Sequence, residues 1–84
     1  MVGMEGILDF MDKITQDKWA NIRSERNLLL VQTDWCVLPD TPLSPELLQQ
    51  IKEYRQKLRE ITKDFNNPED VIFPINPLEI TVEN

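Results

Sequence analysis

The side chains that most often perform catalysis are scarce in this sequence. It contains no histidine, one cysteine and two glycines among 84 residues, so it has neither a base to activate Cys36 nor a glycine-rich loop to bind phosphate. Zinc-site spacings of cysteine and histidine are absent as well. Two carboxylate pairs, Asp9 with Asp12 and Glu69 with Asp70, have the residue types for acid and base chemistry, but both lie in segments expected to be exposed. We therefore expect no enzyme, no metal site and no cofactor.

The charge of the chain argues against nucleic acid and membranes as partners. Its formal net charge is −6, which repels phosphate backbones and anionic lipids. Basic residues of 52–63 alternate with acidic ones, and pairs such as Glu53 with Lys57 are typical of a solvated helix face. The first residues lack the pattern of a signal peptide, and no apolar run is long enough to cross a membrane. We expect a soluble protein of the cell interior, in which Cys36 is a buried or half-buried apolar residue.

A long helix is predicted over about residues 4–32. This segment contains no proline and, after Gly6, no glycine. Its apolar residues recur at helical spacing, at Ile7, Met11, Ile14, Trp19, Ile22 and Leu29. Thr15 followed by Asp17 resembles a helix start, so the segment forms either one long helix or two nearly collinear ones. Residues 28–31 are apolar on every side and need cover on more than one side.

A second helix is predicted over about residues 45–63. Ser44 supplies an oxygen as N-cap, and Pro45 suits the first helical position because the N–H that it lacks would have no partner there. The apolar residues that follow are spaced alternately by four and three positions, at Leu47, Ile51, Tyr54, Leu58 and Ile61. Such a narrow seam is typical of two helices that lie side by side. The predicted fold class is therefore mainly α, an antiparallel helical hairpin.

A stiff segment, TDWCVLPDTPLS at residues 33–44, joins the two helices. Its prolines restrict the backbone, and we expect Trp35 and Leu38 to be buried where the helices diverge. Asp34 and Asp40 are candidates to cap helix ends or to pair with arginines of either helix, which are Arg23, Arg26, Arg55 and Arg59. The predicted hinge residues are Trp35, Leu38, Pro39, Asp40, Pro42, Ser44 and Tyr54.

Residues 65–84 are predicted to form an extended arm. The Asn-Asn-Pro of 66–68 stops the second helix, and Pro74 and Pro77 impose extended backbone on the residues before them. The segment is too apolar for a solvated tail. Its last part, LEITVEN, alternates apolar and polar residues, which allows a short strand that has no partner within the chain. The arm is therefore expected to pair with another molecule or to lie extended on a surface.

The segment from Ile22 to Ile61, followed by the exit VIFPINP, resembles the bacteriophage tail assembly chaperone family. The resemblance rests on Arg23, Arg26, Leu29, Thr33, Asp34, Trp35, Leu38, Asp40, Pro42, Leu43, Tyr54, Arg55, Leu58, Arg59, Phe73, Pro74 and Pro77. It covers roughly the last two thirds of the chain. Ile51 and Phe73 stand where the family often has tryptophan, and the first twenty residues match nothing in the family.

The resemblance implies a phage tail fibre assembly chaperone that acts in the host cytoplasm. It would bind the fibre protein, with three copies per fibre trimer, and assist folding, trimerisation or attachment. The chain divides into an N-terminal helical extension at 1–21, a hairpin core at 22–64 and an arm at 65–84. The predicted partner-binding residues are Ile7, Met11, Ile14, Trp19, Val71, Ile72, Phe73, Ile75, Leu78, Ile80 and Val82.

Two other functions remain open. In the first, the chain is a small structural virion or adaptor protein that self-associates as a coiled coil through its N-terminal helix. In the second, its acidic character mimics nucleic acid and inhibits a host protein, although its charges are mixed along the chain.

Overall fold

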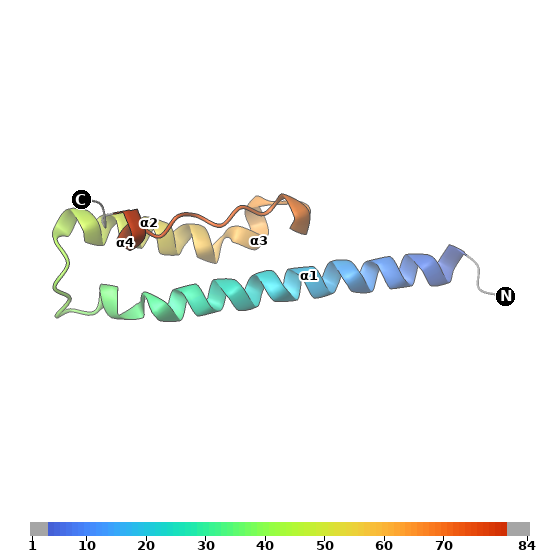
Figure 1. Ribbon diagram of the computed structural model, residues 1–84, viewed down its shortest axis with the longest axis horizontal. Coiled ribbons are helices and arrows are strands. Elements are labelled where there is room, and N and C mark those ends of the chain that lie inside the picture. The colour runs from blue at the N-terminus through green and yellow to red at the C-terminus, as the bar shows by residue number, and fades with distance from the viewer. Residues whose placement is uncertain (1–3, 81–84) are drawn as a thin grey trace.

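The computed structural model describes residues 4–80 and shows a long antiparallel helical hairpin with an arm folded back onto it (Figure 1). Its elements, in order, are α1 (Met4–Gln32), the 3₁₀ turn η1 (Asp34–Val37), α2 (Pro45–Arg59), α3 (Ile61–Asp64), the 3₁₀ turn η2 (Pro68–Asp70) and α4 (Pro77–Ile80). The described residues form no strand. The predicted mainly α hairpin is thus confirmed. Within residues 4–80, no helix is both long enough and apolar enough to cross a membrane.

Helix α1 is one continuous element of 29 residues, which resolves the alternative of two collinear helices. At 1.5 Å per residue it is about 43 Å long, whereas the 15 residues of α2 span about 22 Å. The first half of α1 therefore extends beyond its partner. The radius of gyration is 17.7 Å, against about 12 Å expected for a compact chain of this length.

Helix α2 begins where the sequence predicts and ends slightly earlier. The Ser44 hydroxyl accepts the backbone N–H of Leu47 at 3.2 Å, with Pro45 in the first turn. The predicted helix over 45–63 is interrupted at Glu60, whose φ of −98° and ψ of 4° separate α2 from the short α3. Ile61, the first residue of α3, is almost fully buried, so the buried face continues across the break.

The core is the seam of α2 together with two residues from the turn. Four members of the predicted seam are buried, Ile51, Tyr54, Leu58 and Ile61, and Leu47 is half-buried. The turn adds Thr33 and Cys36, which are 1% and 0% exposed. The prediction of a buried Cys36 is confirmed.

The prediction that Trp35 and Leu38 are buried is wrong, because they are 44% and 56% exposed. The reason is the 3₁₀ geometry of η1. Three residues per turn place Thr33 and Cys36 one above the other, so both face the core. Trp35 then points away from it.

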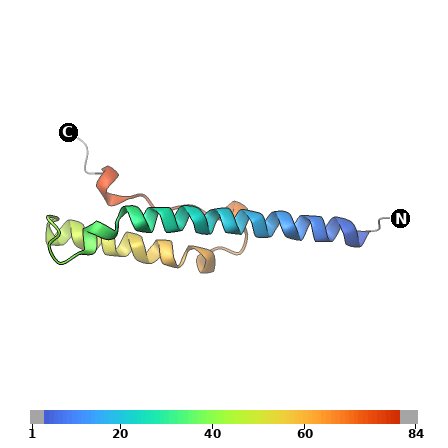
Figure 2. The same ribbon diagram turned by 90° about the horizontal axis from the view of Figure 1, so that it is seen from below.

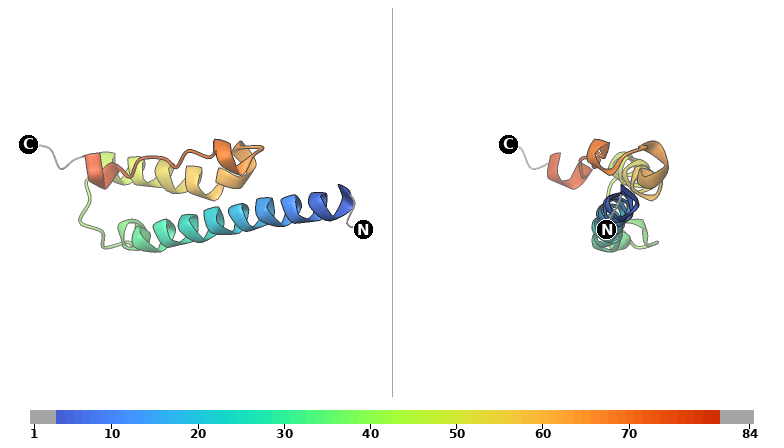
Figure 3. Two further views of the ribbon diagram at one scale, coloured as in Figure 1. Left: turned by 45° about the vertical axis from the view of Figure 1, so that its right-hand side comes forward. Right: turned by 90° about the vertical axis from the view of Figure 1, so that its right-hand side faces the viewer.

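The arm runs back along α2 from α3 toward the turn (Figure 1). The right-hand view of Figure 3 shows α1, α2 and the end of the arm at three corners of a triangle, and Figure 2 shows the arm beside the hairpin along α1. The arm therefore forms a third side of the core. Pro77 is buried there.

The predicted terminal strand is wrong for the described residues 78–80, because Pro77–Ile80 forms the helical turn α4. The Asn76 side-chain oxygen accepts the N–H of Leu78 at 2.9 Å, and its carbonyl accepts the N–H of Glu79 at 2.9 Å. An asparagine before proline is a helix-start signal that outweighs the alternation of apolar residues here. Val82 lies outside the described residues.

Candidate interaction surfaces

The turn between the helices is held by Arg55, which reaches from α2 to the C-terminal end of α1. The last carbonyl groups of a helix lack partners within it, and the last turn of α1 contains no basic residue. Arg55 Nη1 donates to the Leu30 carbonyl at 2.7 Å and to the Thr33 hydroxyl at 2.8 Å, and Nη2 donates to Asp34 Oδ1 at 2.8 Å. The predicted pairing of Asp34 with an arginine is confirmed.

The two buried titratable side chains of the core are held in their neutral forms. Burial raises the pKa of the Cys36 thiol, an effect that the charge of Arg55 partly opposes. Burial also raises the pKa of Tyr54, with further contributions from Glu79 and Glu25. Glu25 on α1 and Glu79 on α4 thus both act electrostatically on this side chain of α2. Cys36 is a core residue with little thiolate character.

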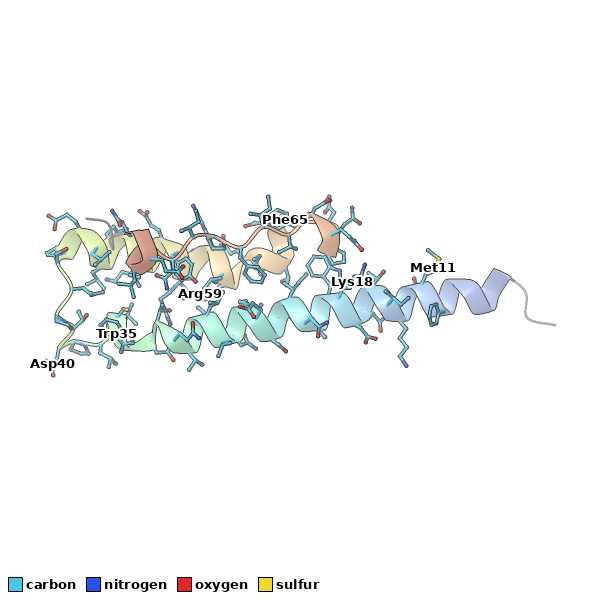
Figure 4. The ribbon with its side chains drawn as sticks, viewed as in Figure 1. Met11, Lys18, Trp35, Asp40, Arg59 and Phe65 are labelled. Atoms are coloured by element: carbon cyan, nitrogen blue, oxygen red, sulfur yellow. The ribbon has the colours of Figure 1, made fainter. Side chains whose placement is uncertain are left out.

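The turn end of the hairpin exposes a group of large apolar side chains that we call the turn patch. Its members are Leu28, Val31, Trp35, Val37 and Leu38. Figure 4 labels Trp35 and Asp40 at this end of the molecule. The four other hinge residues of the turn, Pro39, Asp40, Pro42 and Ser44, are exposed too, whereas Tyr54 is in the core. This surface is not predicted from the sequence, because the large side chain of Trp35 is expected to be buried in the core.

The N-terminal half of α1 carries a second exposed group, the N-terminal stripe, formed by Phe10, Met11 and Ile14. Every residue from 10 to 18 is exposed, whereas Trp19 is half-buried. Figure 4 shows Met11 beyond the point where the arm turns back. Met11 and Ile14 were predicted as partner-binding residues and Phe10 was missed. The side chain of Ile7 lies outside the described part of the chain.

The arm divides the predicted partner-binding residues into an inner and an outer set. Val71, Phe73 and Leu78 are half-buried against the hairpin. Ile72 and Ile75 point away and are 76% and 70% exposed. The side chain of Ile80 is outside the described residues. Among the described apolar side chains of the arm, Ile72 and Ile75 are therefore the most accessible to a partner while the arm is docked.

Two open hollows separate the arm from α2. The larger, about 370 Å³, is lined by Gln50, Glu53, Tyr54, Lys57, Pro74, Ile75 and Pro77. The smaller, about 270 Å³, is lined by Lys57, Ile61, Asp64, Phe65, Ile72, Phe73 and Pro74. Lys57 and Pro74 border both. The arm is therefore packed less closely than the α2 seam.

An exposed ion pair joins the start of the arm to the middle of α1. Lys18 Nζ lies 2.5 Å from Glu69 Oε2, and η2 packs against α1 at this point. The hydrogen bond from Lys18 lowers the pKa of the Glu69 carboxyl. Glu69, one of the carboxylates with the residue type for acid and base chemistry, thus forms an ion pair that joins the arm to α1. Figure 4 labels Lys18 on α1 and Phe65 at the end of α3, where the arm begins.

These features describe a small helical protein that exposes apolar surface at its turn, its arm and the free end of its long helix. The family model for the phage tail assembly chaperone protein matches residues 19–78, and the chain belongs to this family. No curated protein and no solved structure matches it. The family resemblance inferred from the sequence is confirmed. The match begins at Trp19, next to the exposed segment 10–18.

Proposed function

We propose that this tail assembly chaperone binds the tail fibre protein and covers its apolar or edge-strand surface until the fibre trimer is complete. Family membership supports a role in tail assembly and indicates a non-enzymatic one. The observation that carries the finer proposal is the outward position of Ile72 and Ile75 on a docked arm. Large apolar side chains that a small protein leaves exposed commonly mark binding sites.

The arm suits a client that offers an unpaired strand. Residues 71–76 belong to no helix, and Pro68, Pro74 and Pro77 limit their freedom. Pro74 has no N–H to donate, so the segment can pair only as an edge strand with that position facing away from the sheet. An extended segment of this kind adds to a sheet edge through main-chain hydrogen bonds, with alternate side chains in pockets. Burial of apolar area contributes roughly 25 cal/mol per Å². The cost of ordering the arm and its partner offsets much of this gain, so we expect a reversible contact.

The N-terminal stripe is the second proposed contact. Met11 and Ile14 lie three positions apart, as helix-in-groove anchors do. Through this stripe the chaperone would contact the fibre or a second copy of itself. We propose three copies for each fibre trimer, acting in the cytoplasm of the infected host.

Co-expression with the fibre protein of the same phage tests the function. We expect a complex that survives gel filtration and more soluble trimer than without the chaperone. The variant Ile72→Ser with Ile75→Ser changes two exposed positions, so it should weaken the complex and leave the hairpin folded. The matched control Ile72→Val with Ile75→Val should retain it. A fibre that is soluble and trimeric alone, with no complex, would contradict the proposal.

The alternative is a permanent virion or adaptor protein that self-associates through the N-terminal stripe. The observation in its favour is the exposed segment 10–17, which precedes Lys18, the residue that pairs with the arm. Mass spectrometry of purified particles separates the two functions. A fixed copy number in mature virions supports the structural function, and absence from them supports a transient chaperone.

A further inference from the structure

The turn patch combines exposed apolar area with a charge of one sign. Residues 27–51 contain no lysine or arginine, and their charged residues are Asp34, Asp40 and Glu46. Arg55 pairs with Asp34 from the α2 side, yet the Asp34 side chain stays 60% exposed. The turn thus exposes Trp35 and Leu38 together with two carboxylates, Asp34 and Asp40, which we call the acidic rim of the patch.

The core does not require these exposed side chains. Thr33 and Cys36 already fill the space below the turn, and Arg55 holds the end of α1. An exposed tryptophan beside other apolar residues lowers solubility, whereas tryptophan is enriched among residues that dominate binding energy. The patch also lies inside residues 19–78, the part that matches the family, unlike the N-terminal stripe.

We propose that the turn patch is a docking surface for a basic, amphipathic segment of the tail protein that this chaperone assists. Apolar side chains of that segment would pack on Trp35 and Leu38, and its lysines or arginines would face Asp34 and Asp40. This inference rests on the proposed function and adds a third contact, at the opposite end of the hairpin from the N-terminal stripe.

Charge complementarity disfavours a second copy of this chain as the occupant. The basic residues of 52–63 alternate with Glu53 and Glu60, and the N-terminal stripe is flanked by Asp12 and Asp17 as well as by lysines. Neither segment is both apolar and free of acidic residues, so neither complements the charge of the acidic rim.

The test measures the affinity of purified variants for the fibre protein of the same phage. Trp35→Ala and Leu38→Ser should each weaken binding at least roughly tenfold, as residues central to an interface do. The matched controls Trp35→Phe and Leu38→Met keep apolar area and should stay within about threefold. Circular dichroism and urea unfolding of each variant verify that the hairpin is folded.

Charge reversal tests the chemistry of the partner. Asp40→Lys should weaken binding several-fold and flatten its dependence on salt, because rim charges are screened by added ions. The same change at the other end of the hairpin, Asp64→Lys, should have little effect. Tighter binding of Asp40→Lys would overturn the assignment of a basic partner.

The outcomes separate this inference from the function on which it rests. If the wild-type protein forms no complex with the fibre, both fail. If it forms a complex that Trp35→Ala and Leu38→Ser leave unchanged, while the Ile72 and Ile75 variant loses it, only the turn patch is wrong. Self-association in gel filtration that Trp35→Ala abolishes would assign the patch to a second copy and overturn the inference.

Discussion

The Arg55 guanidinium lies 2.8 Å from the hydroxyl oxygen of Thr33, at the point where α1 ends and the chain turns. Thr33 in turn donates that hydroxyl to the Leu29 carbonyl at 3.0 Å. Because the Arg55 side chain is only 13% exposed, solvent screens these bonds weakly. One side chain of α2 thus completes the end of α1 and fixes the direction of the turn.

Replacing Arg55 should therefore destabilise the hairpin. We expect Arg55→Met to lower the free energy of unfolding by about 2–3 kcal/mol, since hydrogen bonds from a charged donor to partly buried acceptors are lost. Arg59→Met removes an exposed arginine of the same helix that contacts Gln56, and it should cost less than about 0.5 kcal/mol. Urea unfolding followed by circular dichroism measures both. Equal effects would mean that Arg55 does not hold the turn.

The core and the turn patch should respond differently to truncation. Leu58→Ala creates a cavity in a fully buried position and should cost about 2–5 kcal/mol. Trp35→Ala removes a side chain that is 44% exposed and should cost about 1 kcal/mol. Thermal and urea unfolding give the comparison. A larger loss of stability for Trp35→Ala than for Leu58→Ala would indicate that the indole is buried in the core.

Tyr54 should ionise only at a pH above its ordinary range. The pKa is raised from the ordinary value of 10.0, first by burial and then by Glu79 and Glu25. Because the folded state favours the neutral phenol, this contribution to stability is complete below pH 10 and is lost as the pH rises through the folded pKa. Phenolate absorbance reports it directly, since the chain has one tyrosine. A midpoint at or below 10 would contradict the burial.

The Lys18–Glu69 ion pair predicts an acid-sensitive junction between α1 and the arm. Its hydrogen bond lowers the pKa of Glu69 below the ordinary 4.5. The contribution of the charged carboxylate is therefore present above pH 4.5 and is lost as the pH falls through the folded pKa. Carbon-detected NMR titration of the Glu69 carboxyl should show the lowered midpoint, and Lys18→Met should restore it. An identical midpoint in both proteins would contradict the pair.

Removal of residues 1–16 should leave the hairpin folded. Residues 10–16 are all exposed, with Ile14 the least exposed apolar one at 38%, and the deletion retains Lys18 and the whole segment that matches the family. We expect the urea midpoint to change little, because the buried core residues from Thr33 to Ile61 lie outside the deletion. Collapse of the truncated protein would show that the extension is part of the folding unit.

The parts of this fold that the sequence predicts well are those governed by local rules. Ser44 and Pro45 determine the start of α2, and the alternation from Leu47 to Ile61 determines which face is buried. Each of these rules depends on neighbours within two helical turns. The family resemblance drew on the same segments, and it is confirmed over residues 19–78.

The errors concern features that depend on geometry across the chain. The size of Trp35 favours a place in the core, but the 3₁₀ turn has three residues per turn. It therefore directs Thr33 and Cys36, three positions apart, toward the core instead. The sequence predicts that the arm pairs with another molecule or lies extended on a surface, without saying which of its side chains face inward. Docking against the hairpin distinguishes the exposed Ile72 and Ile75 from their half-buried neighbours. No pattern of residue types alone contains that distinction.

The difference in length between α1 and α2 sets the N-terminal stripe apart from the turn patch. Its described surfaces spread over principal extents of 63 × 26 × 19 Å, with the N-terminal stripe toward one end and the turn patch at the other. A single small domain cannot touch both at once, so simultaneous use requires an elongated client or two clients held apart. The continuous helix would then set their separation, and inserting or deleting whole turns before Trp19 would change that distance in steps of about 5.4 Å.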